Sequence, residues 1–223
     1  MQLAEATSSD TAGSHLVLVP IGSLEQHGPH LPLDTDTVVA KAVAAAAGEE
    51  LDAWVAPAIA YGSSGEHQSF PGTVSIGTDA LRHTVVELVR SLSTWADRVL
   101  LVNGHGGNVA ALAAAVDQLV VEGHDVAWVP CAEGSIDLHA GRSETSLMLH
   151  LSPWTVRLHR AEAGDTNPLE AILPRLRAGG VEAVSGNGVL GDPNGANAAE
   201  GARVFDAMVR SVVRIADDVV SQR

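Results

Sequence analysis

The sequence predicts a single layered α/β domain with α/β/α packing and a mostly parallel central sheet. Three observations support this fold class. Short apolar runs rich in Val and Leu alternate with longer segments of helical period, which is the pattern of parallel strands joined by helical crossovers. The length of 223 residues falls within the range of one α/β unit. An apolar content of 46% is sufficient for a buried core.

Each predicted strand is a short apolar run bounded by turn residues, which is typical of strands buried on both faces. The first such run stops at Pro20 and Gly22, and the third leads into a Gly-rich turn. The predicted strands cover residues 15–21, 53–59, 98–102 and 126–130.

The helices are predicted from apolar stripes and from residues typical of helix ends. Gly48 is a plausible stop for the first helix, and Asn108 and Ser143 are plausible N-caps of later ones. Pro153 predicts the end of the helix that Ser143 begins. The predicted helices cover residues 36–47, 79–96, 109–121, 144–151, 169–178 and 198–220, with a Gly- and Asn-rich loop at 185–197.

Composition and charge limit the partners and the domain count. Residues 1–13 are small, polar and aperiodic, so we expect a flexible N-terminal segment followed by one domain over 14–223. A formal charge of −14 argues against a nucleic-acid partner. No run approaches the roughly 20 apolar residues of a membrane span, and no secretory signal is visible. A lone Cys131 fits a reducing compartment, so we expect a cytoplasmic protein.

The segment GSLEQHGPH at 22–30 follows the first predicted strand. In an extended chain Glu25 and His27 share a face about 7 Å apart, which suits ligands of two neighbouring metal ions. Asp36 at the first turn of the next helix is our candidate for a bridging carboxylate. If Asp36 stood alone, helix-start electrostatics would be the favoured explanation of it; beside Glu25 and His27, a metal ligand is favoured. Asp34 is an alternative ligand or a simple helix cap.

The segment NGHGGN at 103–108 places His105 in a strand-to-helix turn, where parallel sheets locate their sites. A phosphate-binding P-loop is excluded, because no Gly-Lys-Ser/Thr follows. A buried histidine bonded to backbone remains an alternative to a metal ligand. We expect Asn103 and Asn108 to stabilise the turn.

The segment HAGRSET at 139–145 adds His139 and Glu144. Glu144 is the candidate fifth metal ligand and a catalytic carboxylate, with helix capping as the alternative. His139 is either a ligand or a proton donor, since imidazole titrates in the right range. Together these residues predict a metal-dependent hydrolase with two divalent ions, and Zn, Fe and Mn all accept this ligand set.

A polar loop at 61–73 and an aromatic residue on the fourth strand are candidates for binding substrate. Tyr61, Glu66 and His67 lie in the loop, and Trp128 lies on the strand. An ordinary surface loop, and a core position for Trp128, are the alternatives.

With these motifs, the chain resembles the creatininase family of amidohydrolases. The segments GSLEQHGPHLPLDTD at 22–36, NGHGGN at 103–108 and ETSLML at 144–149 carry the resemblance, which spans about residues 17–209. It implies a layered α/β fold, a homo-oligomer that is often a hexamer, and a dinuclear site. Glu25, His27, Asp36 and His105 match family ligands, and His139 matches the family proton donor. Gly107 stands where creatininase has a fifth ligand, so we expect Glu144 to replace it.

Within the family, the segments at 56–70, 125–128 and 188–193 resemble a peptidase that removes a modified Val-Tyr-derived end from a precursor peptide. The resemblance therefore implies a modified precursor peptide as substrate. Two other functions remain open. One is hydrolysis of a small cyclic or formyl amide, and the other is a non-catalytic metal-binding assembly protein.

Overall fold

The structure is a computed structural model that describes residues 1–132 and 137–221, with the backbone alone for 218–221. A four-stranded parallel sheet forms its centre, in the order β2-β1-β3-β4. The strands are β1 (Val17–Ile21), β2 (Trp54–Val55), β3 (Val99–Asn103) and β4 (Val126–Pro130). The predicted fold class is thereby confirmed.

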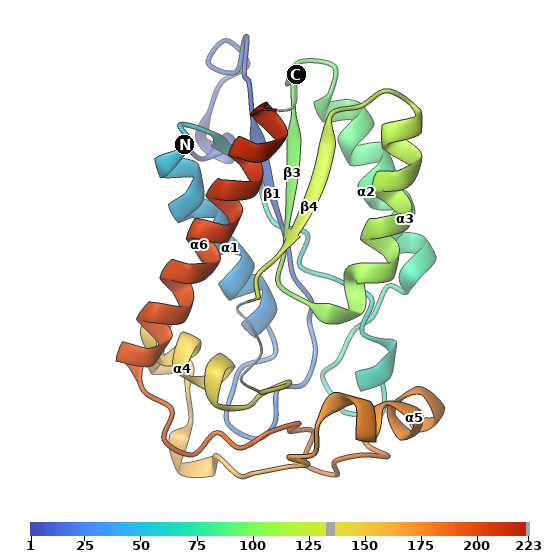
Figure 1. Ribbon diagram of the computed structural model, residues 1–223, viewed down its shortest axis with the longest axis vertical. Coiled ribbons are helices and arrows are strands. Elements are labelled where there is room, and N and C mark those ends of the chain that lie inside the picture. Colours follow the sequence, from blue (N-terminus) through green and yellow to red (C-terminus); the bar gives the residue numbers. More distant parts are fainter. Residues whose placement is uncertain (133–136, 222–223) are drawn as a thin grey trace.

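Helices cover both faces of the sheet, as Figure 1 shows. The helices α1, α4 and α6 contact one another on one face, and α2 and α3 pack together on the other. They are α1 (Thr35–Glu50), α2 (Thr78–Leu92), α3 (Val109–Val121), α4 (Arg142–Leu151), α5 (Leu169–Gly179) and α6 (Ala198–Ser221). None of these described helices is both long enough and apolar enough to span a membrane.

Side chains from alternate positions of the strands enter two separate cores. Val17, Val19 and Ile21 of β1 point towards α2 and α3, whereas Leu18 points towards α1 and α6. All four are fully buried. A strand that buries both faces needs apolar side chains at successive positions, which is why the sequence showed continuous apolar runs.

The second strand is shorter than the sequence predicted. Residues 53–59 were expected to form one strand, but only Trp54 and Val55 pair continuously with β1. The N–H groups of Trp54 and Ala56 donate to the carbonyls of Leu16 and Leu18, but the next carbonyl, that of Pro20, accepts the N–H of Ile59, so the regular spacing of the ladder ends after Ala56. The chain rejoins the sheet edge at Ile59 through an isolated bridge to Ile21.

The N-terminal segment lies against this same edge. Gln2 forms a bridge with Val55, and the carbonyl of Met1 accepts the N–H of Val55 at 2.8 Å. Flexibility of residues 1–13 stays a prediction, and these contacts give its first residues a defined place beside β2.

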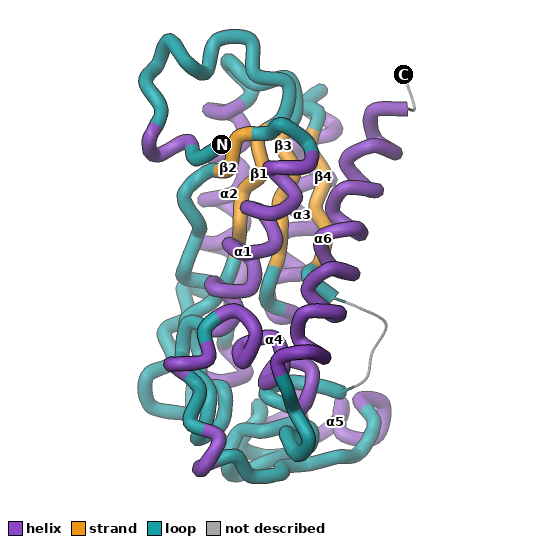
Figure 2. Tube along the Cα trace, turned by 90° about the vertical axis from the view of Figure 1, so that its left-hand side faces the viewer, coloured by secondary structure: helices purple, strands orange, loops and turns teal. Residues whose placement is uncertain are grey.

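The loops that follow the strands gather at one end of the molecule, together with α4 and α5. Figure 2 shows this end below the strands, which are drawn in orange. Asn108 ties three of these loops together. Its Oδ1 accepts the N–H of Ser63 at 2.8 Å, and its Nδ2 donates to the carbonyl of Gly22 at 3.0 Å and to Asn103 Oδ1 at 3.1 Å. The expected N-cap bond of this side chain is not formed.

Candidate metal centre

The carboxyl ends of the strands bring the predicted ligands together. The segment after β1 supplies Glu25 and His27, and the first turn of α1 supplies Asp36. His105 follows β3, and Glu144 lies in the first turn of α4. These positions all follow the carboxyl ends of parallel strands, where α/β folds place their sites.

The five side chains form two sets of three that share one carboxylate. Glu25, Asp36 and His105 offer one set of ligand atoms, and His27, Asp36 and Glu144 offer a second, while His139 forms a further set with Glu25 and His27. Within each set the ligand atoms lie within 4.8 Å of one another. Asp36 Oδ1 is 3.2 Å from His27 Nε2, and its Oδ2 is 3.4 Å from His105 Nδ1. The carboxylate of Asp36 therefore belongs to the first two sets, with one oxygen near His27 and the other near His105.

The buried carboxylates have oxygens that the protein leaves without donors. Glu25 is 0% exposed and Asp36 is 2% exposed. Among the described residues, Glu25 Oε1 and Asp36 Oδ2 are buried and accept no hydrogen bond. Burying a charged oxygen without a partner is costly, and a bound cation removes that cost. The donor set of carboxylate oxygens and imidazole nitrogens fits divalent metal ions.

Electrostatics keep two of the imidazoles protonated. Burial lowers the pKa of His27, but the charges of Asp36 and Glu144 outweigh burial and raise it to about 10. For His105, burial is again outweighed, here by the hydrogen bond to Glu25 and the charge of Asp36, and the pKa rises to about 9. Burial raises the pKa of Asp36 to about 6, against the opposing charge of His27.

His139 has a defined tautomer beside these ligands. Its Nε2 lies 2.7 Å from the backbone carbonyl of Gln26, which can only accept, so the hydrogen is on Nε2. Nδ1 is then unprotonated and lies 3.7 Å from Glu25 Oε1. Burial and the charge of His27 lower the pKa of His139 to about 4, so the ring is neutral at pH 7.

Gln26 is a residue that the sequence reasoning left unassigned, although it stands between Glu25 and His27 in the motif. Its side-chain nitrogen lies 2.8 Å from His67 Nδ1 and donates to the carbonyl of Gly188 at 3.0 Å. His67 Nε2 in turn lies 3.3 Å from Glu25 Oε1. Burial and the charge of His139 lower the pKa of His67 to about 3. Gln26 thus orients a neutral imidazole against a metal-ligand candidate.

Position 107 has no room for a side chain. A Cβ there would lie 2.4 Å from Glu66 Oε1, from His105 Nε2 and from the carbonyl oxygen of Ser63. The carboxylate of Glu66 instead lies 3.5 Å from His105 Nε2, and burial raises its pKa. Glycine is therefore required here, and a carboxylate from another loop occupies the space beside His105.

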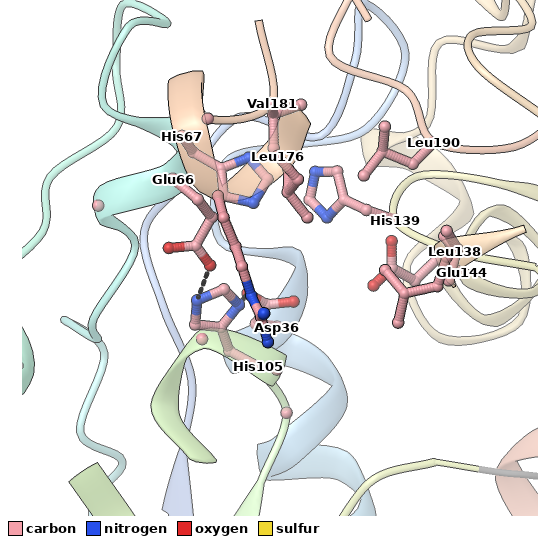
Figure 3. Close-up of a pocket in the computed structure, with 17 residues that line it drawn as sticks. Asp36, Glu66, His67, His105, Leu138, His139, Glu144, Leu176, Val181 and Leu190 are labelled. Atoms are coloured by element: carbon pink, nitrogen blue, oxygen red, sulfur yellow. Dashed lines mark ion pairs between the residues drawn. The ribbon is translucent and has the colours of Figure 1, made fainter. Parts of the chain in front are cut away.

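These groups line a cavity of about 750 Å³. Figure 3 shows His67 and His139 above Asp36 and His105, with Glu144 to the side. A cavity of this size takes a small ligand or the end of a peptide.

Two of the predicted substrate-binding residues lie outside this cavity. Glu66 and His67 are among its lining residues, but Tyr61 and Trp128 are not. Tyr61 is 49% exposed. Trp128 is half-buried on β4 and packs against the core under α2 and α3, because its position in the strand points to that face.

The local start of α4 also differs from the prediction. Ser143 was expected to cap this helix, but the N-cap position is Gly141. The carboxylate of Asp137 accepts the backbone N–H groups of Arg142 and Ser143. Glu144 Oε2 accepts the N–H of Ala140 at 2.6 Å, which holds its side chain near His27 Nε2 at 3.9 Å.

Comparison with known proteins agrees with this geometry. The family model described as creatinine amidohydrolase matches residues 1–216. A mycofactocin precursor peptide peptidase from Mycolicibacterium smegmatis is 58% identical over 200 residues, which is 87% of this chain and 81% of that protein. A creatinine amidohydrolase from Pseudomonas putida is 32% identical over 179 residues, covering 67% of this chain and 69% of the relative.

Solved structures with the same fold include metal-bound forms. A structure described as creatininase Mn has a TM-score of 0.79 and 27% identity, with 96% of each chain covered. A mutant creatininase of Zn-Zn type has the same TM-score, identity and coverage. The match of the family model to nearly the whole sequence, together with these relatives, shows that this chain belongs to the creatininase family.

Proposed function

We propose that this protein is a metal-dependent peptidase that cleaves the modified Val-Tyr-derived end from the mycofactocin precursor peptide. The position of Asp36 between two ligand sets is the observation on which the proposal rests. The identity of 58% to a mycofactocin precursor peptide peptidase supports the choice of substrate. Hydrolysis of a small amide is the second candidate, favoured by the 32% identity to a creatinine amidohydrolase.

Five side chains would hold two divalent ions. Glu25, Asp36 and His105 would bind one ion, and His27, Asp36 and Glu144 the other. Glu144 thereby takes the place of the ligand that Gly107 does not supply. Bound divalent ions supply Lewis-acid chemistry, because they lower the pKa of a water towards about 7 and polarise an amide carbonyl.

His139 is the residue that moves the proton in this proposal. Its unprotonated Nδ1 faces Glu25, and its Nε2–H is held by the Gln26 carbonyl. A neutral imidazole in this orientation accepts a proton at Nδ1 when water attacks the carbonyl. It then gives that proton to the departing amine. Glu66 and His67 lie on the cavity side of the ligands, where they contact the peptide.

The proposal also covers assembly and location. We propose a homo-oligomer, in the form of the hexamer that the resemblance implies, in the cytoplasm. Sedimentation of the purified protein tests the oligomeric state, and a hexamer of the 23.0 kDa chain would have a mass of about 138 kDa, six times 23.0.

The test measures cleavage and metal content together. Purified protein is stripped with a chelator, reloaded with Zn, Mn or Fe, and incubated with the modified precursor peptide, and products are read by mass spectrometry. We expect that the metal-loaded protein cleaves the peptide before the Val-Tyr-derived unit and that the stripped protein does not. Cleavage of creatinine instead of the peptide would favour the second candidate. Tight metal binding without hydrolysis of either would favour a non-catalytic assembly protein.

A matched pair of variants tests the role of Asp36. Asp36→Asn removes the shared charge, and we expect it to lower both metal content and kcat/KM, the latter about a hundredfold or more. Asp34→Asn makes the same chemical change two residues away, at an exposed position whose side chain makes no cap bond. It should retain both metal and activity. Equal losses in the two variants would contradict the assignment.

A further inference from the structure

The cavity has an aliphatic wall in addition to its polar floor. Leu169 and Leu176 of α5 lie seven residues apart, on one face of the helix, and both line the cavity. Val181, Leu190 and Leu138 extend the same wall. In the view of Figure 3, Val181 lies above His67 and His139, Leu176 lies between these two rings, and Asp36 and His105 lie below them.

This wall belongs to a small core of its own, away from the two cores of the sheet. Its buried members are Ile172, Val181, Val184 and Leu190, and the partly buried Leu138 and Leu176 pack against them. Leu169 is nevertheless 41% exposed. A folded chain gains nothing from facing leucines into a water-filled cavity, because apolar surface is favourable only when it leaves water. The wall is therefore suited to an apolar ligand group.

Backbone hydrogen bonds fix the position of the wall relative to the candidate metal centre. The N–H of Val181 donates to the carbonyl of Glu66 at 2.8 Å, and the N–H of Leu190 donates to the carbonyl of His139 at 2.8 Å. Gly180 has a φ of +69°, and a Cβ there would lie 2.6 Å from the Glu66 carbonyl. The backbone at Gly180, directly after α5, therefore packs so closely against the backbone of Glu66 that a side chain at position 180 would not fit.

We infer that this aliphatic wall, formed by Leu169, Leu176, Val181, Leu190 and Leu138, is the subsite for an apolar group next to the scissile amide. The inference rests on the proposed function, because the Val-Tyr-derived end is the part of that substrate with an aromatic ring and a branched aliphatic group. Arg177 is the single Lys or Arg among the described lining residues, and its side chain is exposed. The five residues of the wall itself carry no charge, so they recognise their ligand by apolar contact.

The experiment compares leucine truncations inside and outside the cavity. Leu169→Ala and Leu176→Ala should raise KM for the modified precursor peptide about tenfold, with kcat and metal content unchanged, because they remove contacts made equally in ground and transition states. Leu158→Ala is the matched control, since Leu158 is 47% exposed and is not among the residues lining this cavity. Leu176→Met keeps the volume and should restore a KM near that of the unaltered protein. Equal KM values in all four variants would overturn the inference.

A binding measurement separates this inference from the proposed function. Ligand-observed NMR with 4-ethylphenol, a neutral aromatic probe, needs no cleavage. We expect binding to the metal-loaded protein and to Leu158→Ala, and about tenfold weaker binding to Leu176→Ala. If the peptide is not cleaved but this order of binding holds, the function is wrong and the subsite stands. If the peptide is cleaved but the probe binds all variants alike and KM is unchanged, the subsite is wrong and the function stands.

Discussion

At the scale of single residues, neighbours decide the protonation state of each imidazole in the site. His27 and His105 face carboxylates, and their pKa values rise to about 10 and about 9. His67 and His139 are also buried but lie close to other imidazoles, and their pKa values fall to about 3 and about 4. The same side chain is therefore a protonated metal-ligand candidate at two positions and a neutral imidazole at two others.

This difference predicts how metal binding depends on pH. At pH 7 the metal-free protein carries protons on His27 and His105, since 7 lies below both of their pKa values. Metal ligands must be deprotonated, so loading both ions should release about two protons per chain. The affinity of the protein for metal should rise with pH up to about pH 9 to 10, and it should fall as the pH is lowered. Calorimetry in two buffers of different ionisation enthalpy measures the number of protons released.

The matched variant for that measurement is His67→Gln. His67 is a neutral imidazole at pH 7, because its pKa is about 3, so its replacement should leave the number of protons released on metal binding unchanged. Metal binding without proton release in the unaltered protein would refute the ligand assignment of His27 and His105.

At the scale of elements, the site is built from loops that follow different strands. Side-chain hydrogen bonds connect these loops to one another. Asn108 connects the loops after β1, β2 and β3 through Gly22, Ser63 and Asn103. Asp137 holds the start of α4, and so the position of Glu144, by accepting two backbone N–H groups. Side chains thus supply the connections that a sheet ladder would supply elsewhere.

We predict that Asn108→Ala lowers the free energy of unfolding by about 2 kcal/mol or more. The substitution leaves the buried N–H of Ser63 and carbonyl of Gly22 without partners, and each unsatisfied group costs about 1–3 kcal/mol. Urea unfolding measures the effect as a shift in midpoint at constant slope. Asn167→Ala, at an exposed position, is the control. A midpoint equal to that of the control would show that Asn108 does not tie the loops.

At the scale of the whole molecule, the metal centre makes the fold depend on cations. Part of the formal charge of −14 comes from Glu25 and Asp36, which are buried at the edge of the sheet. Ions that bind these groups in the folded state alone stabilise it by mass action, by about 2.7 kcal/mol at a hundred times the Kd. The native state is therefore weakest when the metal is removed.

We predict that chelation lowers Tm by about 5–10 °C, because each kcal/mol shifts the Tm of a chain of this length by about 2–4 °C. Scanning calorimetry with and without added metal measures the change. The Asp36→Asn variant should show a smaller rise in Tm when metal is added, because it lacks the carboxylate that the two ligand sets share. An identical Tm for loaded and stripped protein would contradict a role for the ions in stability.

The sequence by itself determined the fold class, because strands buried on both faces must be apolar throughout and their helices must be amphipathic. It also gave residues 109–121 as a helix with the bounds that the structure has. Five ligand candidates were identified because carboxylates and imidazoles next to buried strands have few structural uses. Their proximity followed from parallel topology, which places the ends of all strands at one edge.

Only the tertiary structure decided what depends on contacts between distant segments. The leucines of α5 have the same spacing whether they face a core or a cavity, so the sequence could not assign them to the site. Gln26 was overlooked because its role arises from contacts with His67 and Gly188, far along the chain. The second strand ended at Val55, and Asp137 took the capping role expected of Ser143. In each case the physical reason is the same: local patterns specify elements, and packing specifies which side chains meet.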